Sequence, residues 1–425
     1  MVASDLQLRS ISAIEEIAPD RWDACANPQN PAGALREPKR TLPAEIDALR
    51  FHESYNPFLS HRFLLALERS HSAVARQGWA GRHILVEDAG GQLLACAPAY
   101  LKSHSMGEYV FDHSWADAYE RAGGNYYPKL QIAVPFTPVT GRRLLVADTP
   151  RAQEARAMLI GGLQALRAQT GASSSHVTFP TQADYEALGA AGWLKRTGKQ
   201  FHFLNRGYAD FDAFLAALAS RKRKNIRKER EQALAAGIDV HMLTGTDITD
   251  EHWDAFFAFY MDTGSRKWGR PYLTRSFFTE VGRVMAERIL LVMAKRAGRW
   301  IAGAINFIGD DALYGRNWGC IEDHPFLHFE LCYYRAIDFA LSRNMLRVEA
   351  GAQGEHKLAR GYEPVETFSA HEFADARLAA AVEDFLRREH AHVEAEIEIY
   401  GEHTPFKKED PSLRAQRSNP EESSD

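Results

Sequence analysis

Two stretches that lie far apart in this chain repeat one order of local signals. Residues 176–201 (HVTFPTQADYEALGAAGWLKRTGKQF) and 347–371 (RVEAGAQGEHKLARGYEPVETFSAH) each predict a strand, a polar turn, a short helix, a glycine–aromatic pair and a second strand. A long predicted helix precedes each stretch, and an antiparallel meander precedes each helix. Because 425 residues exceed what one hydrophobic core usually spans, two domains are expected. We predict an α/β (α+β) protein with two copies of one unit, each a mixed, mostly antiparallel sheet with flanking helices.

The repeat also sets the expected domain boundaries. We assign residues 1–205 to a first domain and 206–400 to a second domain that carries the active site. Residues 27–50 hold four prolines and few large apolar side chains, which indicates a loop inserted in the first domain. Residues 401–425 are poor in apolar residues and predict a disordered tail.

Charge and cysteine usage narrow the class of protein. A formal net charge of -5 argues against binding DNA over the whole surface and leaves room for a local basic patch. The four cysteines are far apart and form no CxxC, as is typical of a reducing compartment. The N-terminus lacks the apolar region of a signal peptide, and no run of about 18 apolar residues is present. We expect a cytoplasmic protein without a transmembrane segment, whose contact with a membrane would be transient and superficial.

The segment EAGAQGEHKLARGY (349–362) is the densest group of reactive side chains, and it follows a predicted strand. Ligands of α/β sheets bind beyond the carboxyl ends of such strands. Transfer of an acyl group to an amine needs a base and donors for the carbonyl oxygen. The candidate catalytic residues are the possible bases Glu349, Glu355 and His356, together with Gln353 as a hydrogen-bond donor. Lys357 and Arg360 are further hydrogen-bond donors and candidate substrate-binding residues. The alternative is a polar loop in which Glu355 pairs with Lys357 or Arg360 in solvent.

The helix predicted at 324–344 adds one more candidate. Glu330 lies in its first turns and would face the site, although the helix dipole offers a simpler role for a carboxylate there. His324 and His328 are four residues apart, but a third histidine at a fitting spacing and the HExxH order are missing. We therefore expect no metal site.

Two further segments are candidates for holding the acyl donor. In the strand YGRNWG (314–319), alternation puts Tyr314, Arg316 and Trp318 on one face and Asn317 between two glycines on the other, where a ligand could approach the backbone. Arg316 and Asn317 are candidates to contact the donor. The segment 220–230 (SRKRKNIRKER) is a strongly basic helix, in which Lys224, Arg227 and Lys228 share one face and could clamp phosphates. The alternatives are a sheet face covered by aromatics and a solvated basic helix.

Residues 102–143 mix aromatic and charged side chains in a way that suits a cleft for a small or peptide-like molecule. An interface between the two domains would explain the same composition. The candidate substrate-binding residues here are Lys102, His104, Glu108, Asp112, Trp115, Tyr126, Tyr127 and Lys129.

These residues carry a family resemblance. The runs GEYVFDHSWADAYERAGGNYYPKLQIAVPFTPVTGRRLL and LYGRNWGCIEDHPFLHFELCYYRAIDFALSRNMLRVEAGAQGEHKLARGYEPVETFSAH resemble FemAB-like predicted N-acyltransferases, labelled peptidoglycan biosynthesis/recognition, over roughly residues 50–395. The basic helix resembles that of Fem-type peptidyltransferases, which attach amino acids from aminoacyl-tRNA to cell-wall precursors. The resemblance implies two tandem domains of the acyl-CoA N-acyltransferase (GNAT) type. In that fold two central parallel strands splay apart and hold the acyl donor.

One departure bears on the donor. GNAT enzymes that use acetyl-CoA usually carry a Q/R-x-x-G-x-G/A loop, whose backbone holds the pyrophosphate. The corresponding junction here, NWGCIEDHPFLHFEL (317–331), lacks those glycines. We expect no tightly bound cofactor, and acyl-CoA or aminoacyl-tRNA as co-substrate.

The expected function is transfer of an acyl or aminoacyl group to a primary amine of a small or peptide-like acceptor. The alternatives are a tRNA-dependent, Fem-type cell-wall aminoacyltransferase, for which tRNA would be a partner, and a non-catalytic module that binds peptidoglycan or peptide.

Overall fold

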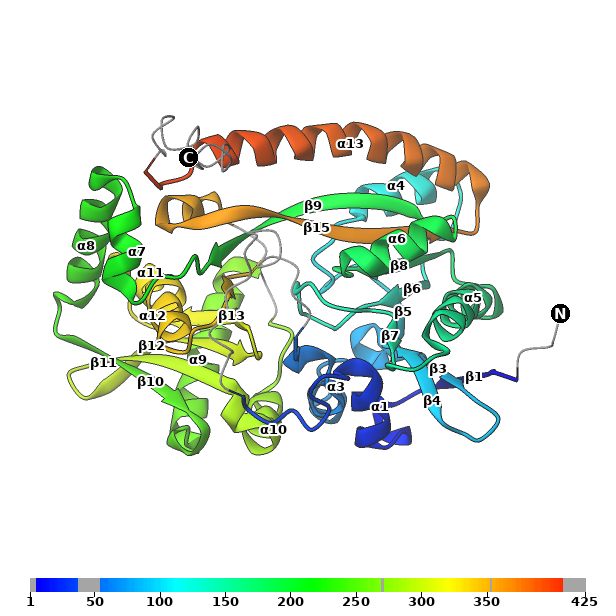
Figure 1. Ribbon diagram of the computed structural model, residues 1–425, viewed down its shortest axis with the longest axis horizontal. Coiled ribbons are helices and arrows are strands. Elements are labelled where there is room, and N and C mark those ends of the chain that lie inside the picture. Colours follow the sequence, from blue (N-terminus) through cyan, green and yellow to red (C-terminus); the bar gives the residue numbers. More distant parts are fainter. Residues whose placement is uncertain (1–4, 37–53, 269–270, 352–353, 408–425) are drawn as a thin grey trace, which may run out of the picture.

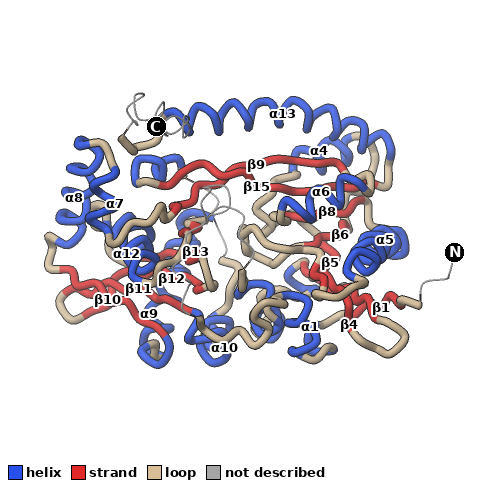
Figure 2. Tube along the Cα trace, viewed as in Figure 1, coloured by secondary structure: helices blue, strands red, loops and turns tan. Residues whose placement is uncertain are grey.

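The computed structural model describes residues 5–36, 54–268, 271–351 and 354–407 (Figure 1). Within these ranges the strands form two sheets, one of eleven strands and one of four. The tube view shows the longer sheet running through the molecule with helices around it (Figure 2). In this part of the chain, no helix is both long enough and apolar enough to cross a membrane.

The strands of the long sheet are, in the order in which they lie side by side, β10 (Ile238–Thr244), β11 (Ile289–Arg296), β12 (Arg299–Ile308), β13 (Ala312–Cys320), β14 (Arg347–Glu349), β9 (Leu194–Leu204), β15 (Tyr362–Phe373), β8 (Ser174–Thr178), β6 (Lys129–Ile132), β5 (Ala99–Lys102) and β2 (Trp79–Gly81). The short sheet contains β1 (Gln7–Ile11), β3 (His83–Glu87), β4 (Leu93–Ala97) and β7 (Leu145–Val146).

The helices of the first half are α1 (Pro19–Ala26), α3 (His61–Arg69), α4 (His113–Arg121), α5 (Ala152–Thr170) and α6 (Gln182–Ala190), with short turns η1 (Ile14–Glu16), η2 (Pro57–Leu59) and η3 (Ala75–Gln77). The helices of the second half are α7 (Phe211–Ala217), α8 (Ser220–Leu234), α9 (Asp250–Trp268), α10 (Arg275–Met285), α11 (Leu327–Phe329), α12 (Arg335–Ser342) and α13 (Ala376–Glu402). Short turns here are η4 (Gly245–Asp247), η5 (Ala286–Arg288), η7 (Glu355–Arg360) and the π-helical turn η6 (Glu330–Tyr334) between α11 and α12.

Local sequence explains where several of these helices start and stop. Thr181 and Asp210 cap α6 and α7, because their side-chain oxygens accept from the backbone N–H groups of Asp184 and Ala213. The glycine of each repeated glycine–aromatic pair ends a short helix with positive φ, 89° at Gly192 and 87° at Gly361. Glycine adopts this conformation without the cost of a Cβ, which is why both copies keep it.

The two repeats exchange their last strands. β9 closes the first repeat in sequence, but it pairs with β14 of the second repeat, and β15 of the second repeat pairs with β8 of the first. β9 and β15 also pair with each other over ten residues, from Tyr362–Phe203 to His371–Leu194. In Figure 1 these two strands cross the molecule beneath α13. The long sheet therefore continues through the expected boundary at residue 205.

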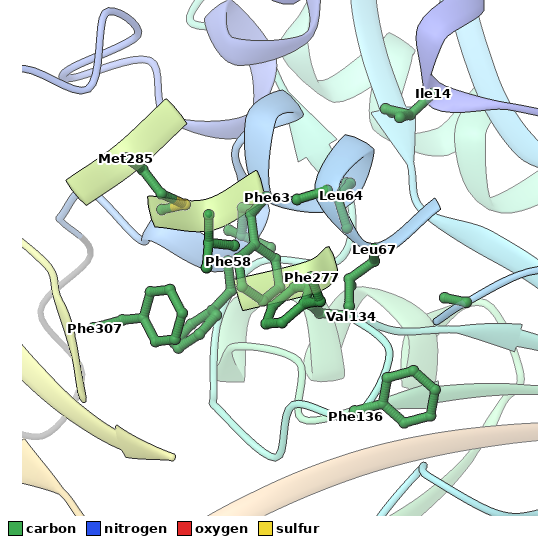
Figure 3. Close-up of a cluster of buried hydrophobic side chains, with 14 of the residues drawn as sticks. Ile14, Phe58, Phe63, Leu64, Leu67, Val134, Phe136, Phe277, Met285 and Phe307 are labelled. Atoms are coloured by element: carbon green, nitrogen blue, oxygen red, sulfur yellow. The ribbon is translucent and has the colours of Figure 1, made fainter. Parts of the chain in front are cut away.

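A shared core fixes the two repeats against each other on one side of the sheet. Phe63 of α3 packs against Phe277 of α10, with ring centroids 5.9 Å apart, and against Phe307 of β12, at 5.5 Å. Phe58 lies 5.1 Å from Phe307. Figure 3 shows these rings with Met285 in one cluster. Because this cluster holds residues from both repeats, the two repeats pack together as one unit.

The predicted fold class and the repeated unit are confirmed, and two local features differ from expectation. Residues 401–407 are not a free tail, because α13 continues to Glu402 and Phe406 bridges to Leu218. The expectation for residues 408–425, like most of the expected loop 27–50, lies outside the described residues. The second difference concerns β13.

A β-bulge in β13 breaks the expected alternation of side chains. Ile305 pairs with Asn317 and Asn306 pairs with Gly315, so Arg316 is the extra residue. As a result Tyr314 packs in the core shared by the repeats, whereas Trp318 packs in the separate core under α11 and α12. The prediction that Tyr314 and Trp318 share a face was wrong, because sequence alternation assumes an unbroken ladder.

Candidate active site between β13 and β14

The parallel strands β13 and β14 separate at one well-defined point. Their ladder consists of three pairs and ends at Tyr314 opposite Glu349. The next residues, Gly315 and Ala350, are small, and a Cβ on Gly315 would lie 3.5 Å from Cα of Ala350. Beyond this point β14 has ended while β13 continues to Cys320, so the pairing stops, as expected for the splayed pair of the predicted fold. We call this end of the β13–β14 ladder, at Tyr314 and Glu349, the junction.

A small slot of about 80 Å³ opens on one side of the junction. Gly315, Asn317 and Ala350 line its strand side, and His328, Cys332 and Tyr333 line its helix side. Those three helical residues come from α11 and from the π-helical turn η6. Such turns insert one residue into a helix and often occur at functional sites.

Side chains of η7 pack against the helix side of the slot. The Tyr333 hydroxyl and His356 Nε2 form a 2.9 Å hydrogen bond. Arg360 stacks 3.4 Å from the ring centre of Phe329 and donates to Glu229. Lys357 is buried, and its Nζ donates to the carbonyl of Gly351 over 2.7 Å. Burial lowers the pKa of Lys357 to about 7, and an electrostatic interaction with Cys332 partly opposes this shift.

A second, larger cavity of about 560 Å³ opens at the junction and lies between the repeats. Tyr314, Arg347 and Glu349 form its lining from the second repeat. Most of the remaining lining comes from the first repeat, including the segments around Asn27, residues 54–56, 140–142 and the start of α6. The volume is in the range of sites that hold a small molecule or a short peptide.

Several polar atoms in the wall of this cavity are buried without a partner. Arg347 Nε donates to Glu349 Oε1 over 2.9 Å. Within the part of the chain that the structure describes, Arg347 Nη1 and Glu349 Oε2 have no hydrogen-bond partner, and the same is true of the hydroxyls of Ser54, Tyr55 and Thr140. All five residues line the cavity. Native proteins leave few such groups unpaired, so the cluster points to a ligand or to ordered water.

The exchanged strand β9 brings a histidine to the same place. His202 pairs in the sheet with Glu349, and its Nε2 lies 3.9 Å from Glu349 Oε2. His202 Nε2 and Gln200 Oε1 are 3.3 Å apart. The 3.9 Å separation is too long for a hydrogen bond. The carboxylate at the junction therefore faces groups from both repeats.

The predicted catalytic residues do not all gather here. Glu349 lies at the junction, with an exposed fraction of 3%. Glu355 is exposed and accepts a 2.6 Å hydrogen bond from Tyr400 of α13. Glu330 is buried, and its carboxylate is bound by Arg230 and Arg335. His356 bonds Tyr333 on the helix side of the slot, and Gln353 lies outside the described residues.

The predicted donor-binding residues are also divided. Asn317 lines the slot. Arg316 also lines the slot, and it donates to the carbonyl of Phe136, which links β13 to the first repeat. Lys224, Arg227 and Lys228 are exposed on the side of α8 opposite the buried Ile226, and Arg227 is 3.1 Å from Asp212. Helix α8 itself packs against η6 and η7, so its exposed cations border the slot region without lining the slot.

The predicted substrate-binding residues of the first repeat form a buried network at the start of β6. Lys129 donates to Asp112, and to Glu108 over 2.7 Å and Ser105 over 2.8 Å. Lys102 Nζ sits 3.6 Å from the ring centre of Trp79. The other members contact residues nearby. Tyr126 is hydrogen-bonded to Asp112, Tyr127 to Ser105, and His104 to the carbonyl of Gln77. The ring of Trp115 packs edge-to-face against His371. The network is satisfied largely by its own members, and none of them lines the large cavity.

Burial perturbs this network strongly. It raises the pKa of Glu108 to about 7 and lowers that of Lys102 to about 7. Burial alone would raise the pKa of Asp112, but the charge of Lys129, the neighbouring His176 and hydrogen bonds from Lys129 and Ser105 together hold this pKa well below its usual value. Lys129 is the first residue of β6, and the parallel ladder with β8 runs from Leu130 to Ile132. The charged network therefore lies at the N-terminal end of this strand pair, remote from its opening.

The opening of that first pair is filled by an arginine. Arg143 is buried, and its guanidinium donates to the carbonyls of Thr178, Gly141 and Val139 over 2.8–2.9 Å. Thr178 occupies the place in HVTFP (176–180) that Glu349 occupies in RVEAG (347–351). The first repeat thus has neither a carboxylate at the corresponding position nor an unfilled guanidinium there.

Sequence reasoning did not select Arg347, although a signal was available. Arg347 stands two positions before Glu349, and strand alternation places both side chains on one face. The first-repeat residues Ser54, Tyr55 and Thr140 gave no such signal, because only the packing of the two repeats brings them to Glu349.

The chain is similar to one protein family and to several solved structures. The profile of the FemAB-like family, described as peptidoglycan biosynthesis/recognition, matches residues 13–408. The solved structure of FemX matches 82% of this chain and 100% of its own, with 13% identity and a TM-score of 0.50. A tandem GNAT protein from the clavulanic acid biosynthesis pathway matches 87% of this chain and 99% of its own, at 13% identity and a TM-score of 0.43. L-PGS from Bacillus licheniformis matches 83% and 98%, at 9% identity and a TM-score of 0.48.

No curated protein matches the sequence at a significant level. The predicted FemAB-like resemblance and the predicted fold of two GNAT-like domains are confirmed.

Proposed function

Because the chain belongs to the FemAB-like family, we propose that it is an N-acyltransferase whose active site is the junction between β13 and β14. The observation that carries this proposal is the position of Glu349. Its carboxylate ends the parallel ladder, where the 80 Å³ slot and the 560 Å³ cavity both open. A donor in the slot and an amine in the cavity would meet at this residue.

Each step of such a transfer has a residue suited to it. Glu349 would take a proton from the acceptor ammonium, and the freed amine would attack the acyl carbon. Negative charge would then develop on the carbonyl oxygen, and the buried Lys357 would stabilise it when protonated. The leaving group of the donor would take up the second proton of the amine. The packed interface between the repeats would hold donor and acceptor in register.

Two donors fit the chemistry: a coenzyme A thioester and the ester of an aminoacyl-tRNA. The junction after β13 lacks the glycines that hold a pyrophosphate, which weighs against acetyl-CoA. The exposed Lys224 and Lys228 of α8, next to the elements of the slot, favour a polyanionic donor and so the tRNA-dependent alternative. We expect a cytoplasmic setting for either donor.

The experiment is a donor panel with the wild-type protein: acetyl-CoA, longer acyl-CoAs and aminoacyl-tRNA, each incubated with a mixture of primary amines and followed by mass spectrometry. Acylated amine with a thioester identifies an acyl-CoA enzyme. Product with aminoacyl-tRNA that disappears after ribonuclease treatment identifies the tRNA-dependent form. Ligand binding without any product from any donor would leave the non-catalytic binding module as the better description.

A further inference from the structure

We propose that the acceptor carries a carboxylate directly beside its amine, as the end of an α-amino acid does. The inference rests on the proposed function, because it assigns the substrate class of the same site. It comes from a single feature of the large cavity, the half-satisfied ion pair between Arg347 and Glu349.

The residues of this pair line the cavity. They form one hydrogen bond with each other, and one further polar atom of each residue has no partner among the described residues. Arg347 Nε donates to Glu349 Oε1 over 2.9 Å. Within the described ranges, Arg347 Nη1 and Glu349 Oε2 are buried and lack hydrogen-bond partners. The residues are 5% and 3% exposed. His202 Nε2 lies 3.9 Å from Oε2, which is too long for a hydrogen bond.

The two unpaired atoms need opposite kinds of hydrogen-bond partner. A guanidinium N–H needs an oxygen acceptor, and a carboxylate oxygen needs a donor, best an ammonium. A ligand with only an amine would leave Arg347 Nη1 unpaired, and a ligand with only an anion would leave Glu349 Oε2 unpaired. Each such omission is costly in a buried site. A ligand that carries both groups satisfies both atoms.

The spacing of the two groups follows from the protein. Arg347 and Glu349 are two residues apart on one strand and are already bonded to each other. Ligand groups that complete this pair must therefore be close neighbours, as the ammonium and carboxylate of an α-amino acid are. An amine and a carboxylate at opposite ends of a long chain would not fit.

The rest of the cavity indicates a ligand larger than a free amino acid. Its volume is about 560 Å³. The hydroxyls of Ser54, Tyr55 and Thr140 in its wall are buried and also lack partners among the described residues. These neutral groups suit the amides or hydroxyls of a peptide-like molecule, which would carry the aminocarboxylate at one end.

The reaction balances with this acceptor. Glu349 removes one proton from the ammonium, and the nitrogen attacks the acyl carbon of the thioester or ester. A nitrogen–carbon bond forms, the carbon–sulfur or carbon–oxygen bond breaks, and the leaving thiol or hydroxyl takes the second amine proton. The carboxylate stays on Arg347 throughout, so that the product is an N-acylated amino acid.

The test uses three matched probes with the full chain: L-lysine, cadaverine, which is lysine without its carboxylate, and 6-aminohexanoate, in which amine and carboxylate are far apart. Isothermal titration calorimetry measures binding, and mass spectrometry locates acylation with the active donor. Lysine should bind at least about tenfold more tightly than either other probe, and acylation should fall on its α-amine.

Arg347→Gln should remove the preference for lysine, while Arg9→Gln, a surface change in β1, should keep it. If Arg347→Gln does not fold, the wild-type comparison of the three probes still decides. If cadaverine or 6-aminohexanoate binds or is acylated as well as lysine, the inferred acceptor class is wrong, while the proposed acyltransferase function still stands. If none of the probes binds, the inferred acceptor class is also wrong. Preferred binding of lysine with no product from any donor supports the ligand class but overturns the proposed function.

Discussion

Tyr314 and Glu349 are paired across the parallel strands β13 and β14, and they are the last residues so paired. Their side chains line the cavity between the repeats, whereas the next residue on each strand, Gly315 and Ala350, lines the slot. On each strand, two consecutive residues thus line the cavity and the slot in turn. A carboxylate at this step is the simplest link between a donor site and an acceptor site.

Replacing Glu349 with Gln should abolish most acyl transfer while the protein stays folded. The amide keeps the size of the carboxylate but cannot take a proton, so we expect the rate to fall by roughly 10²–10⁴-fold. Single-turnover acyl transfer with the active donor measures the loss. Glu355→Gln is the matched control, because Glu355 is exposed and bonds Tyr400, and it should retain the wild-type rate within a factor of about two. Equal losses in both variants would contradict the assignment.

Lys357 should impose an upper pH limit on activity. Burial lowers its pKa to about 7, so the protonated form that can stabilise the carbonyl oxygen decreases as pH rises above 7. We expect kcat/KM to descend above that pH. Lys357→Arg keeps a positive charge at all accessible pH values and should remove the descending limb, even if it lowers the maximum. A wild-type profile that stays flat from pH 7 to 9 would exclude this role.

Lys357 should also affect how the free energy of unfolding depends on pH. Between its folded pKa of about 7 and its ordinary value of 10.5, the folded protein binds fewer protons at Lys357 than the unfolded chain does. The free energy of unfolding should therefore rise with pH through this window, by up to about 1.4 kcal/mol per pH unit, relative to Lys357→Met. Urea unfolding of both proteins at pH 7 and 9 gives the difference. A gap between the two proteins that does not change with pH would argue that Lys357 is not perturbed.

The sequence was a good guide wherever structure is local. The repeated order of strand, turn, short helix and strand predicted both copies of the unit, and it placed Glu349 at a strand end. Strand exchange was beyond this reasoning, because nothing in the residues of β9 tells whether it pairs with β8 or with β14. The cluster around Lys129 shows the same limit from the other side. Its composition suits a cleft, but in the packed structure Glu108 and Asp112 form ion pairs with Lys129. The sequence alone does not reveal these contacts.

The aromatic cluster between the repeats should dominate the stability of the whole chain. Phe63 is buried against Phe277 and Phe307, so Phe63→Ala should lower the free energy of unfolding by about 3–5 kcal/mol. The double variant with Phe277→Ala should cost less than the sum of the single changes, because the two rings contact each other. Chemical denaturation measures all three. Ile399→Ala, at an exposed position of α13, should change stability by no more than about 0.5 kcal/mol. Full additivity of the two core variants would contradict a shared core.

Strand exchange predicts that neither repeat folds by itself. Cutting the chain between residues 205 and 206 leaves β9 without its partners β14 and β15, and leaves β8 without β15. Exposed strand edges of this kind pair with other chains, so each half made alone should aggregate. The two halves made together should form a stable one-to-one complex, because β9 and β15 can then pair over their ten residues and the core around Phe63 can close. Size-exclusion chromatography and circular dichroism of the separate and co-expressed halves measure this. A soluble, folded and monomeric first half would show that β9 can pair within its own repeat, and the exchange would then not be required for folding.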